Sequence, residues 1–247
     1  MNKYLLYLEQ WLEEQLAHRQ ADGFIVGVSG GIDSAVVTHL LARKFADKTL
    51  GLILPCKSNT QDQADAECVL QATKIPYQTI DLTQTHQLLF SQVTSFTQKN
   101  TLEQTRVIDG NMRARLRMTT LFAVAQSKNY LVVGTDNLIE WYMGYFTKFG
   151  DGGVDIAPLI HLTKSQVYEL ATLLNVPQQI INKAPSAGLW EEQTDESEIG
   201  VTYKTMENFL AGNPTSAQDE QTIAYWHNRS HHKRAMPRVP LKKNEID

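Results

Sequence analysis

One short segment, residues 24–34, constrains the fold of this chain more than any other. It begins with an apolar run, residues 24–28, of the kind that forms a buried parallel strand. Two glycines then break regular structure, and Asp33 or Ser34 is expected to cap a helix over 35–45. A strand, a glycine turn and a helix in this order present backbone N–H groups to an anion such as a phosphate.

The same alternation of strands and helices continues along the chain. It predicts a doubly wound α/β fold, in which a parallel sheet with right-handed crossovers is flanked by helices. Because ligands of such sheets bind beyond the carboxyl ends of the strands, the loops after the first, second and fourth strands are expected to share one site. Further strands are expected at 50–54, 77–80 and 131–133, with helices at 61–72, 84–95 and 103–127.

The two ends of the chain are expected to lie outside the sheet. Residues 1–20 carry apolar side chains at helical spacing and predict a helix that covers the sheet. Near the other end we expect helices at about 198–211 and 217–230, followed by an extended tail over 231–247 that contains two prolines. The whole chain, 1–247, is expected to form a single domain.

Composition excludes several classes of function. A net charge of −4 argues against a general nucleic-acid-binding protein, for which a basic surface is expected. No apolar run approaches the length of a membrane span. Cys56 and Cys68 are the only cysteines and form no C-x-x-C pair, so neither a disulfide scaffold nor a zinc site is indicated. A protein of the reducing cytoplasm fits this pattern.

Two stretches allow more than one interpretation. Cys56 is either a nucleophile or, more simply, a small apolar neighbour of the bound ligand, since no adjacent residue indicates an activated thiolate. Arg113 and Arg117 share one helix face, which is either a solvated basic surface or a pair of partly buried cations. The rest of that helix is apolar, so we favour burial, and buried arginines bind carboxylates or phosphates.

The glycine loop matches neither of the two common nucleotide motifs. The chain contains no Gly-Lys-Ser/Thr, and the glycine spacing does not fit G-x-G-x-x-G. Thr135 and Glu140 follow the fourth strand and are expected at the same sheet edge as Asp33. Together Asp33 and Glu140 can hold Mg²⁺, with phosphate oxygens of a ligand completing the octahedron. Taken alone, Glu140 would only complement a helix dipole.

Three motifs, in their order and spacing, resemble the ammonia-dependent members of the NAD synthetase family, within the ATP-pyrophosphatase (adenine nucleotide alpha-hydrolase) superfamily. They are Ser-Gly-Gly-Ile-Asp-Ser at 29–34, Gly-Thr-x-x-x-x-Glu at 134–140 and Thr-Lys-Phe-Gly-Asp-Gly-Gly-Val-Asp at 147–155. The last is the most discriminating, because related pyrophosphatases share only the first. Further matches lie at 162–164, 185–190, 193–196 and 232–234, so the resemblance extends from about residue 20 onward.

The resemblance implies a reaction on deamido-NAD (nicotinic acid adenine dinucleotide). ATP would adenylate the pyridine carboxylate and release pyrophosphate, after which ammonia would displace AMP to form NAD. Family members that use glutamine carry an extra amidohydrolase domain, for which this chain has no room. The resemblance also implies Mg²⁺ as cofactor and a homodimer with the substrate near its interface.

Site residues follow from the resemblance position by position. Asp151, Lys164 and Asp33 would be catalytic, and Asp151 would accept the ammonia, since a carboxylate can attract ammonium and take its proton. Without the resemblance, Asp151 and Asp155 would be read as turn caps. ATP would be bound by Gly27, Val28, Ser29, Gly30, Gly31, Ile32, Asp33, Ser34, Thr135, Lys164 and Ser186, deamido-NAD by Arg115, Lys148, Asp155, His232 and Lys233, and the metal by Asp33 and Glu140.

Three features qualify this assignment. Ile32 stands where the family often has Gln, and Ser186 where Thr is common, so a side-chain contact is lost at the first and a hydroxyl is kept at the second. His232-Lys233-Arg234 is expected to fold back onto the site. An acidic run is either a solvated loop or a lid over ATP; it consists of Glu191, Glu192, Asp195, Glu196 and Glu198.

Two other functions compete with this interpretation. Another ATP-pyrophosphatase, acting on xanthylate or tRNA, would share the first motif, but the 147–155 motif and the negative charge argue against it. A non-catalytic nucleotide-binding protein would be expected to have lost at least one of the reactive side chains. All of them are present here: Asp33, Glu140, Lys148, Asp151 and Lys164.

Overall fold

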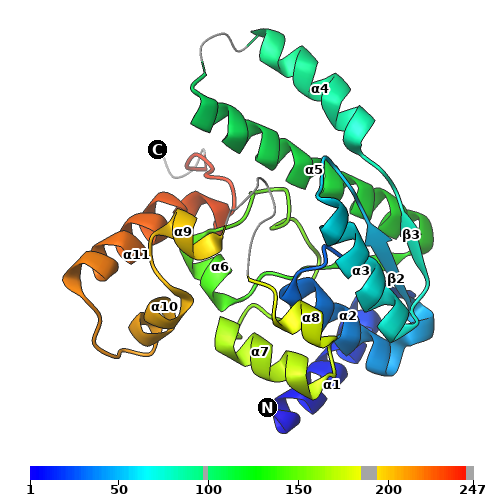
Figure 1. Ribbon diagram of the computed structural model, residues 1–247. Helices are drawn as coiled ribbons and strands as arrows, with labels where there is room; N and C mark the ends of the chain where they lie inside the picture. Colours follow the sequence, from blue (N-terminus) through cyan, green and yellow to red (C-terminus); the bar gives the residue numbers. More distant parts are fainter. Residues whose placement is uncertain (97–99, 185–193, 243–247) are drawn as a thin grey trace.

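The computed structural model describes residues 1–96, 100–184 and 194–242, and four parallel strands form its centre (Figure 1). The strand order is β3-β2-β1-β4, so the direction of winding reverses between β1 and β4. That reversal creates the crevice at which ligands of open α/β sheets bind. The predicted parallel sheet is confirmed, with strands β1 Gly23–Gly27, β2 Thr49–Ile53, β3 Tyr77–Thr79 and β4 Tyr130–Val133.

Helices cover both faces of the sheet because successive side chains of a strand point to opposite sides. Phe24 and Val26 of β1 belong to one buried cluster, while Ile25 between them belongs to a second. The first cluster contains residues of α1 Asn2–Arg19, α2 Ile32–Phe45, α3 Thr60–Thr73, α7 Lys164–Leu173 and α8 Gln178–Ile181. The second is covered by α5 Leu102–Lys128, against which α4 Thr83–Phe96 packs.

A third buried cluster lies outside the sheet. It is built by Ile139 and Met143 together with residues of the C-terminal helices, which lie beside α6 in Figure 1. The helices that share this core are α6 Leu138–Met143, α9 Asp195–Ile199, α10 Tyr203–Leu210 and α11 Ala217–Arg229.

Two of the expected element boundaries are wrong. Neither Asp33 nor Ser34 caps α2, because the helix begins at Ile32 and its N-cap is Gly31, which has no side chain to offer. The helix expected over 198–211 is two helices, because Gly200 adopts a left-handed conformation (φ 82°) that ends α9 before Thr202 caps α10. The predicted N-terminal helix and the helix near 217–230 are confirmed.

The C-terminal tail departs from the extended form at its start. A short 3-10 turn, η2 His231–Lys233, follows α11 before the backbone loses regular structure. Over the ranges described above, no helix is long and apolar enough to cross a membrane.

Candidate active site

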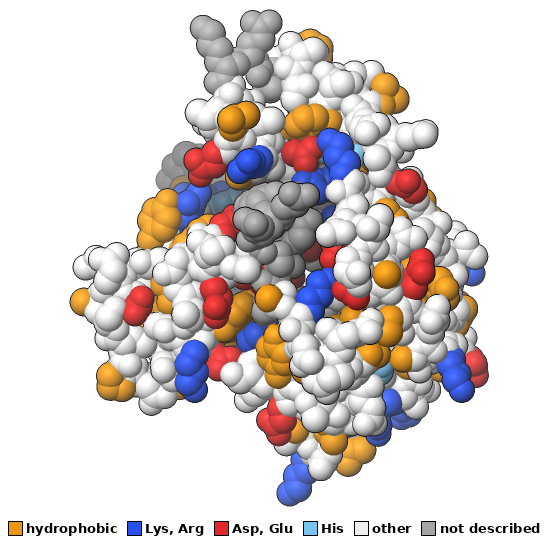
Figure 2. Space-filling model, in the orientation of Figure 1, with side chains coloured by type: hydrophobic (Ala, Val, Ile, Leu, Met, Phe, Trp, Pro, Cys, Tyr) orange, Lys and Arg blue, Asp and Glu red, His pale blue; other side chains and the backbone are white. Residues whose placement is uncertain are grey.

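A cavity of about 1010 Å³ opens at the crevice between β1 and β4. Its walls are formed by the loops after β1, β2 and β4, as the sequence predicted, and by parts of α5 and α7. Acidic and basic side chains both gather toward the middle of this face in Figure 2. The cavity is therefore a charged site at the sheet edge, and its basic wall residues are Lys57, Arg117, Lys164, Lys183, Arg229 and Lys233.

The glycine loop after β1 is held in shape by its own hydroxyls. Ser34 Oγ donates to the Gly31 carbonyl at 2.9 Å and accepts from the Ser29 backbone N–H at 3.2 Å. Gly30 has φ 81°, and a Cβ there would lie 2.6 Å from the Asp62 carbonyl oxygen. Only glycine fits this turn, because both the left-handed backbone and the close neighbour exclude a side chain.

The N-terminus of α2 opens directly into the cavity. Gly31, Ile32 and Asp33 line the wall, and no side chain caps the first turn. The first N–H groups of a helix have no partner within the helix, so they attract an anion when no cap is present. The strand, loop and helix thus have the order and geometry expected from the sequence, with a helix N-terminus that can receive an anion.

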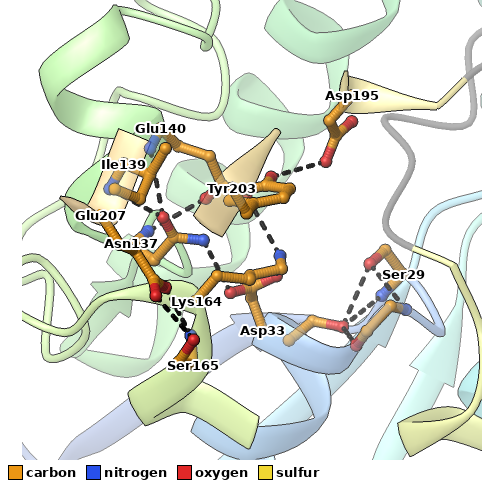
Figure 3. Close-up of polar contacts among 12 residues, drawn as sticks. Ser29, Asp33, Asn137, Ile139, Glu140, Lys164, Ser165, Asp195, Tyr203 and Glu207 are labelled. Atoms are coloured by element: carbon orange, nitrogen blue, oxygen red, sulfur yellow. Dashed lines mark hydrogen bonds and ion pairs between the residues drawn. The ribbon is translucent and has the colours of Figure 1, made fainter. Parts of the chain in front are cut away.

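A single buried asparagine aligns the two expected metal ligands (Figure 3). The Asn137 side chain donates from Nδ2 to Asp33 Oδ1 at 3.0 Å, and the Asn137 backbone N–H donates to Glu140 Oε2 at 3.0 Å. Asn137 Oδ1 in turn accepts from the backbone N–H groups of Ile139 and Glu140 and caps α6. Asn137 therefore fixes α2 against α6 at the point where the two carboxylates meet.

Lys164 lies between the same two carboxylates. Its Nζ is 2.5 Å from Asp33 Oδ2 and 3.5 Å from Glu140 Oε1. Burial and the neighbouring charge of Asp33 raise the pKa of Glu140 to about 8. Burial alone would lower the pKa of Lys164, but the charges of Asp33 and Glu140 outweigh it and raise that pKa. The cluster is thus a buried ammonium held between the side-chain oxygens of Asp33 and Glu140.

The donor set fits a divalent metal ion. Asp33 Oδ2 and Glu140 Oε1 face one position, which Lys164 Nζ occupies, and carboxylate oxygens are the ligands that hard cations such as Mg²⁺ prefer. Within 1–96, 100–184 and 194–242, no group of three or more Asp, Glu, His or Cys side chains could hold a metal by itself. Mg²⁺ in nucleotide sites commonly uses one or two carboxylates plus phosphate oxygens and water.

Tyr203 and Asp195 extend this cluster; Asp195 belongs to the acidic run named above, whereas Tyr203 was not recognised from the sequence. The Tyr203 hydroxyl donates to Asp195 Oδ2 at 2.8 Å and lies 3.5 Å from Glu140 Oε1. Lys164 Nζ lies 5.1 Å from the Tyr203 ring centre. Burial, together with the charges of Glu140 and Asp195, raises the pKa of Tyr203, so the hydroxyl stays protonated and acts as a donor. Tyr203 and Glu140 are 63 residues apart in the sequence, and only the tertiary fold brings them together.

The described part of the acidic run is not a solvated loop. Asp195 accepts the Tyr203 hydroxyl, and Glu196 accepts the Tyr203 backbone N–H at 2.7 Å. Glu198 accepts the Tyr145 hydroxyl at 2.7 Å. These bonds attach α9 to the cavity wall. Glu191, Glu192 and Ser186, also expected near ATP, lie outside the described residues.

Asp151 also lines the cavity. It accepts a hydrogen bond from the Thr147 backbone N–H at 3.0 Å, so it caps a turn and also lines the site. Burial raises the pKa of Asp151 above its ordinary value. Asp136, which the sequence analysis did not single out, also lines the cavity, and burial followed by the charge of Asp151 raises its pKa strongly. Asp136 and Asp151, each with a raised pKa, thus line the same cavity.

Lys233 brings the tail back onto the site. Its Nζ donates to the carbonyls of Gly144 and Phe146 at 2.7 and 2.5 Å, and the residue lines the cavity. Burial lowers the pKa of Lys233, against the opposing charge of Asp151. The fold-back expected of residues 232–234 is therefore present in the structure.

The other residues expected to hold the dinucleotide do not line the cavity of this single chain. Arg115 donates to the Lys148 carbonyl at 3.3 Å, and Lys148 Nζ donates to the His232 carbonyl at 2.6 Å. Asp155 accepts the Val132 backbone N–H at 2.8 Å. Arg115, Lys148 and His232 form a chain of contacts beside the cavity, whereas Asp155 supports the end of β4.

The structure shows whether Arg113 and Arg117 are buried and whether Cys56 is an activated thiol, two points that the sequence left open. Arg117 is partly buried and lines the cavity, where it donates to the Leu54 carbonyl and to Ser58 Oγ. Arg113 pairs instead with Asp109 at 2.7 Å. Cys56 is fully buried, and burial raises the pKa of its thiol, so it is not an activated nucleophile.

Comparison with known proteins gives a consistent result. A family model described as NAD synthase matches residues 4–237. An NH(3)-dependent NAD(+) synthetase from Alkaliphilus metalliredigens is 47% identical over 233 residues, which cover 93% of this chain and 94% of the relative.

Two solved structures extend the similarity to the fold. The NMN synthetase from Francisella tularensis is 47% identical, with a TM-score of 0.91 over 97% of this chain and 98% of that one. The NH3-dependent NAD synthetase from Campylobacter jejuni, solved with a nitrate ion, is 27% identical, with a TM-score of 0.78 over 97% and 99% of the two chains.

Proposed function

The chain belongs to the NAD synthase family, and from that membership we propose that it catalyses the ATP-dependent amidation of deamido-NAD with ammonia. The nicotinate carboxylate is a poor electrophile until ATP adenylates it and pyrophosphate leaves. Ammonia then attacks the acyl-adenylate, NAD forms and AMP is released. The observation that carries this proposal is the phosphate-binding loop and the carboxylate pair at one sheet edge, in a chain similar to ammonia-dependent synthetases over nearly its whole length.

The glycine loop and the end of α2 would bind the ATP phosphates. The first N–H groups of α2 suit the triphosphate, and Thr135 and Lys164 would add a hydroxyl and a cation. Asp33 and Glu140 would hold Mg²⁺, which when bound neutralises phosphate charge and polarises the bond to be cleaved. Ser186 is assigned to ATP by resemblance alone.

Asp151 would act on the nitrogen nucleophile. Its raised pKa brings the carboxyl closer to neutral pH, where a base must exchange protons. Ammonia is mostly protonated at that pH, so a carboxylate would both attract ammonium and remove its proton. Lys233 lies in the same cavity and would help hold the acidic substrate. The other residues assigned to the dinucleotide rest on resemblance alone: Arg115, Lys148, Asp155 and His232.

A second candidate substrate is the mononucleotide of nicotinic acid. The observation that favours it is the similarity to the Francisella tularensis NMN synthetase, which is as identical to this chain as the Alkaliphilus metalliredigens NAD(+) synthetase is. The placement of Arg115, Lys148 and Asp155 outside the cavity is compatible with a substrate that lacks the adenylyl half. Both substrates carry the same nicotinate carboxylate, so the amidation chemistry is unchanged.

One experiment separates the two substrates and tests the nitrogen source. We would measure kcat/KM with deamido-NAD and with nicotinic acid mononucleotide, each with ATP, Mg²⁺ and either ammonium or glutamine. We expect amide product with ammonium only, and a higher kcat/KM for deamido-NAD. A higher value for the mononucleotide would establish the second candidate, and no product from either acid would refute the family assignment of activity.

We propose that the enzyme works as a homodimer with its substrate near the interface. Support comes from exposed apolar side chains on α4 and on the N-terminal part of α5, two helices that lie together at one end of the molecule in Figure 1. Arg115, further along α5, is exposed beside the cavity. The exposed apolar side chains on these two helices are Leu88, Leu89, Phe96, Leu102 and Val107.

We also propose a place in the cytoplasm. The thiols of Cys56 and Cys68, which form no disulfide, agree with it.

A further inference from the structure

The carboxylate pair at the active site is built to present two oxygens to one cation. Asn137 occupies the other oxygen of each group, Oδ1 of Asp33 and Oε2 of Glu140. The remaining oxygens, Oδ2 and Oε1, both face Lys164 Nζ. We call the position between these two oxygens the cation seat. In the structure a side-chain ammonium already fills it (Figure 3).

The surroundings hold this ammonium firmly. Lys164 is only 3% exposed, and its Nζ lies 5.1 Å from the Tyr203 ring centre, on a face that attracts cations. A divalent ion that entered the seat beside Lys164 would meet a like charge at close range in a poorly screened environment. The two cations therefore exclude each other.

We propose that Lys164 is a resident cation that closes the seat to a free divalent ion, so that the metal enters only together with ATP. The proposal rests on the proposed function, which places the metal on Asp33 and Glu140 and the ATP phosphates near Lys164. The phosphates supply the negative charge that draws the ammonium off the carboxylates. A lysine suits this exchange because its point charge is carried on a flexible stem.

The test measures metal binding rather than catalysis. Mn²⁺ serves as the probe, and electron paramagnetic resonance reports the free ion, first without nucleotide. We expect Lys164→Met to bind Mn²⁺ at least about tenfold more tightly than the wild type, since it removes a competing charge at contact distance. Adding Asp33→Asn to Lys164→Met is expected to abolish the gain.

Two matched variants separate this effect from a general change of charge. Lys57→Met removes the same charge from the same cavity wall, where Lys57 faces a single carboxylate, Asp109, at 3.3 Å. It is expected to leave Mn²⁺ affinity at the wild-type value, and so is Lys164→Arg, which keeps a cation in the seat. A gain in Lys57→Met equal to that of Lys164→Met would overturn the proposal.

The wild type alone provides a test that needs no variant to fold. Its Mn²⁺ affinity should rise strongly when α,β-methylene-ATP, which cannot be cleaved between the α- and β-phosphates, is present. Equal affinity with and without this nucleotide, after correction for Mn²⁺ bound by the nucleotide itself, would overturn the proposal.

The same probe distinguishes this inference from the proposed function. If Asp33→Asn and Glu140→Gln leave Mn²⁺ binding by the nucleotide complex unchanged, the metal assignment itself is wrong. If they weaken it while Lys164→Met gains nothing without nucleotide, the metal assignment stands and only the resident-cation inference fails.

Discussion

Asn137 shows how much of this site depends on one neutral side chain. It uses its backbone N–H, its amide nitrogen and its amide oxygen for three different partners, and it is fully buried. One of these contacts caps α6, and the others fix Asp33 and Glu140 relative to each other. Removing the side chain should therefore affect both stability and chemistry.

We predict that Asn137→Ala lowers the free energy of unfolding by about 1 kcal/mol or more, as expected for a lost N-cap. It should also slow ATP cleavage by about tenfold or more, because small displacements of aligned groups are costly. Urea unfolding and pyrophosphate release measure the two effects. Ser216→Ala removes the exposed N-cap of α11 and should cost similar stability with no loss of activity. Equal activity in the two variants would contradict the alignment role.

Asp151 is the residue whose predicted role concerns only the second half of the reaction. We predict that Asp151→Asn leaves adenylation measurable, because the ATP-binding loop is untouched. Amide formation at limiting ammonium should fall by about a hundredfold, the scale of a lost general base. Pyrophosphate release and NAD formation are followed separately in one assay. Normal NAD output at low ammonium would show that another group accepts the ammonia.

The sequence located most of the residues expected to touch phosphate or metal, but not those that hold them in place. Asp33, Glu140 and Lys164 stand in short motifs with recognisable spacing. Asn137 contacts Asp33, 104 residues away in the sequence, and Tyr203 contacts Glu140, 63 residues away. No local sequence pattern indicates contacts between residues so far apart.

Elements were predicted best where burial alone decides the pattern. The four strands lie within a residue or two of their expected positions, because apolar runs between turns leave little choice. Helix ends were less certain, since backbone conformation decides them. Gly31 is the N-cap of α2 and has no side chain by which the helix start could be predicted. Gly200 interrupts a continuous helical pattern by adopting φ 82°.

The turn between β1 and α2 gives a prediction at this scale. Gly30→Ala should destabilise the protein by more than the roughly 1–2 kcal/mol of left-handed strain, because its Cβ also meets the Asp62 carbonyl. Gly212→Ala is the matched control, since Gly212 has φ 74° but no atom within 4 Å of the position that a Cβ would take. Calorimetry should give a larger loss for Gly30→Ala, together with weaker ATP binding. Equal losses would mean that the turn relaxes.

A buried histidine makes helix α2 sensitive to acid. Burial lowers the pKa of His39 below 6.5, so the unfolded chain binds a proton that the folded chain resists. Stability should therefore fall as pH drops from about 7.5 to 5.5, by at most about 1.4 kcal/mol per pH unit for one proton.

His39→Gln tests this account. The variant should show a shallower dependence of unfolding free energy on pH than the wild type, measured by urea titration at several pH values. An unchanged slope in His39→Gln would assign the acid sensitivity to other groups.

For the molecule as a whole, the proposed homodimer would bury the exposed apolar side chains of α4 and α5. We predict that Leu88→Asp with Leu102→Asp converts this proposed dimer to a monomer, because each aspartate would have to be desolvated in the interface. Light scattering after size-exclusion chromatography measures the mass.

Leu6→Asp is the control for assembly. Leu6 lies on α1 and is 62% exposed, close to the 65% of Leu88, yet it lies on a different helix. This variant should remain a dimer. Retention of the dimer by the Leu88 and Leu102 double variant would move the interface elsewhere.

The third buried cluster has a consequence for cooperativity. Asp33 and Lys164 are carried by helices of the sheet core, whereas Glu140 and Tyr203 are carried by helices of the separate C-terminal core. Polar contacts link the two, among them Asn137 to Asp33 and Ser165 to Glu207. Regions with separate cores open as separate units in hydrogen exchange. Amides of α6 and α10 should therefore exchange with solvent through a local opening of the C-terminal core, while the amides of β1 stay protected. In that opened state Glu140 and Tyr203 would leave the site, so catalysis would cease although the sheet is still folded.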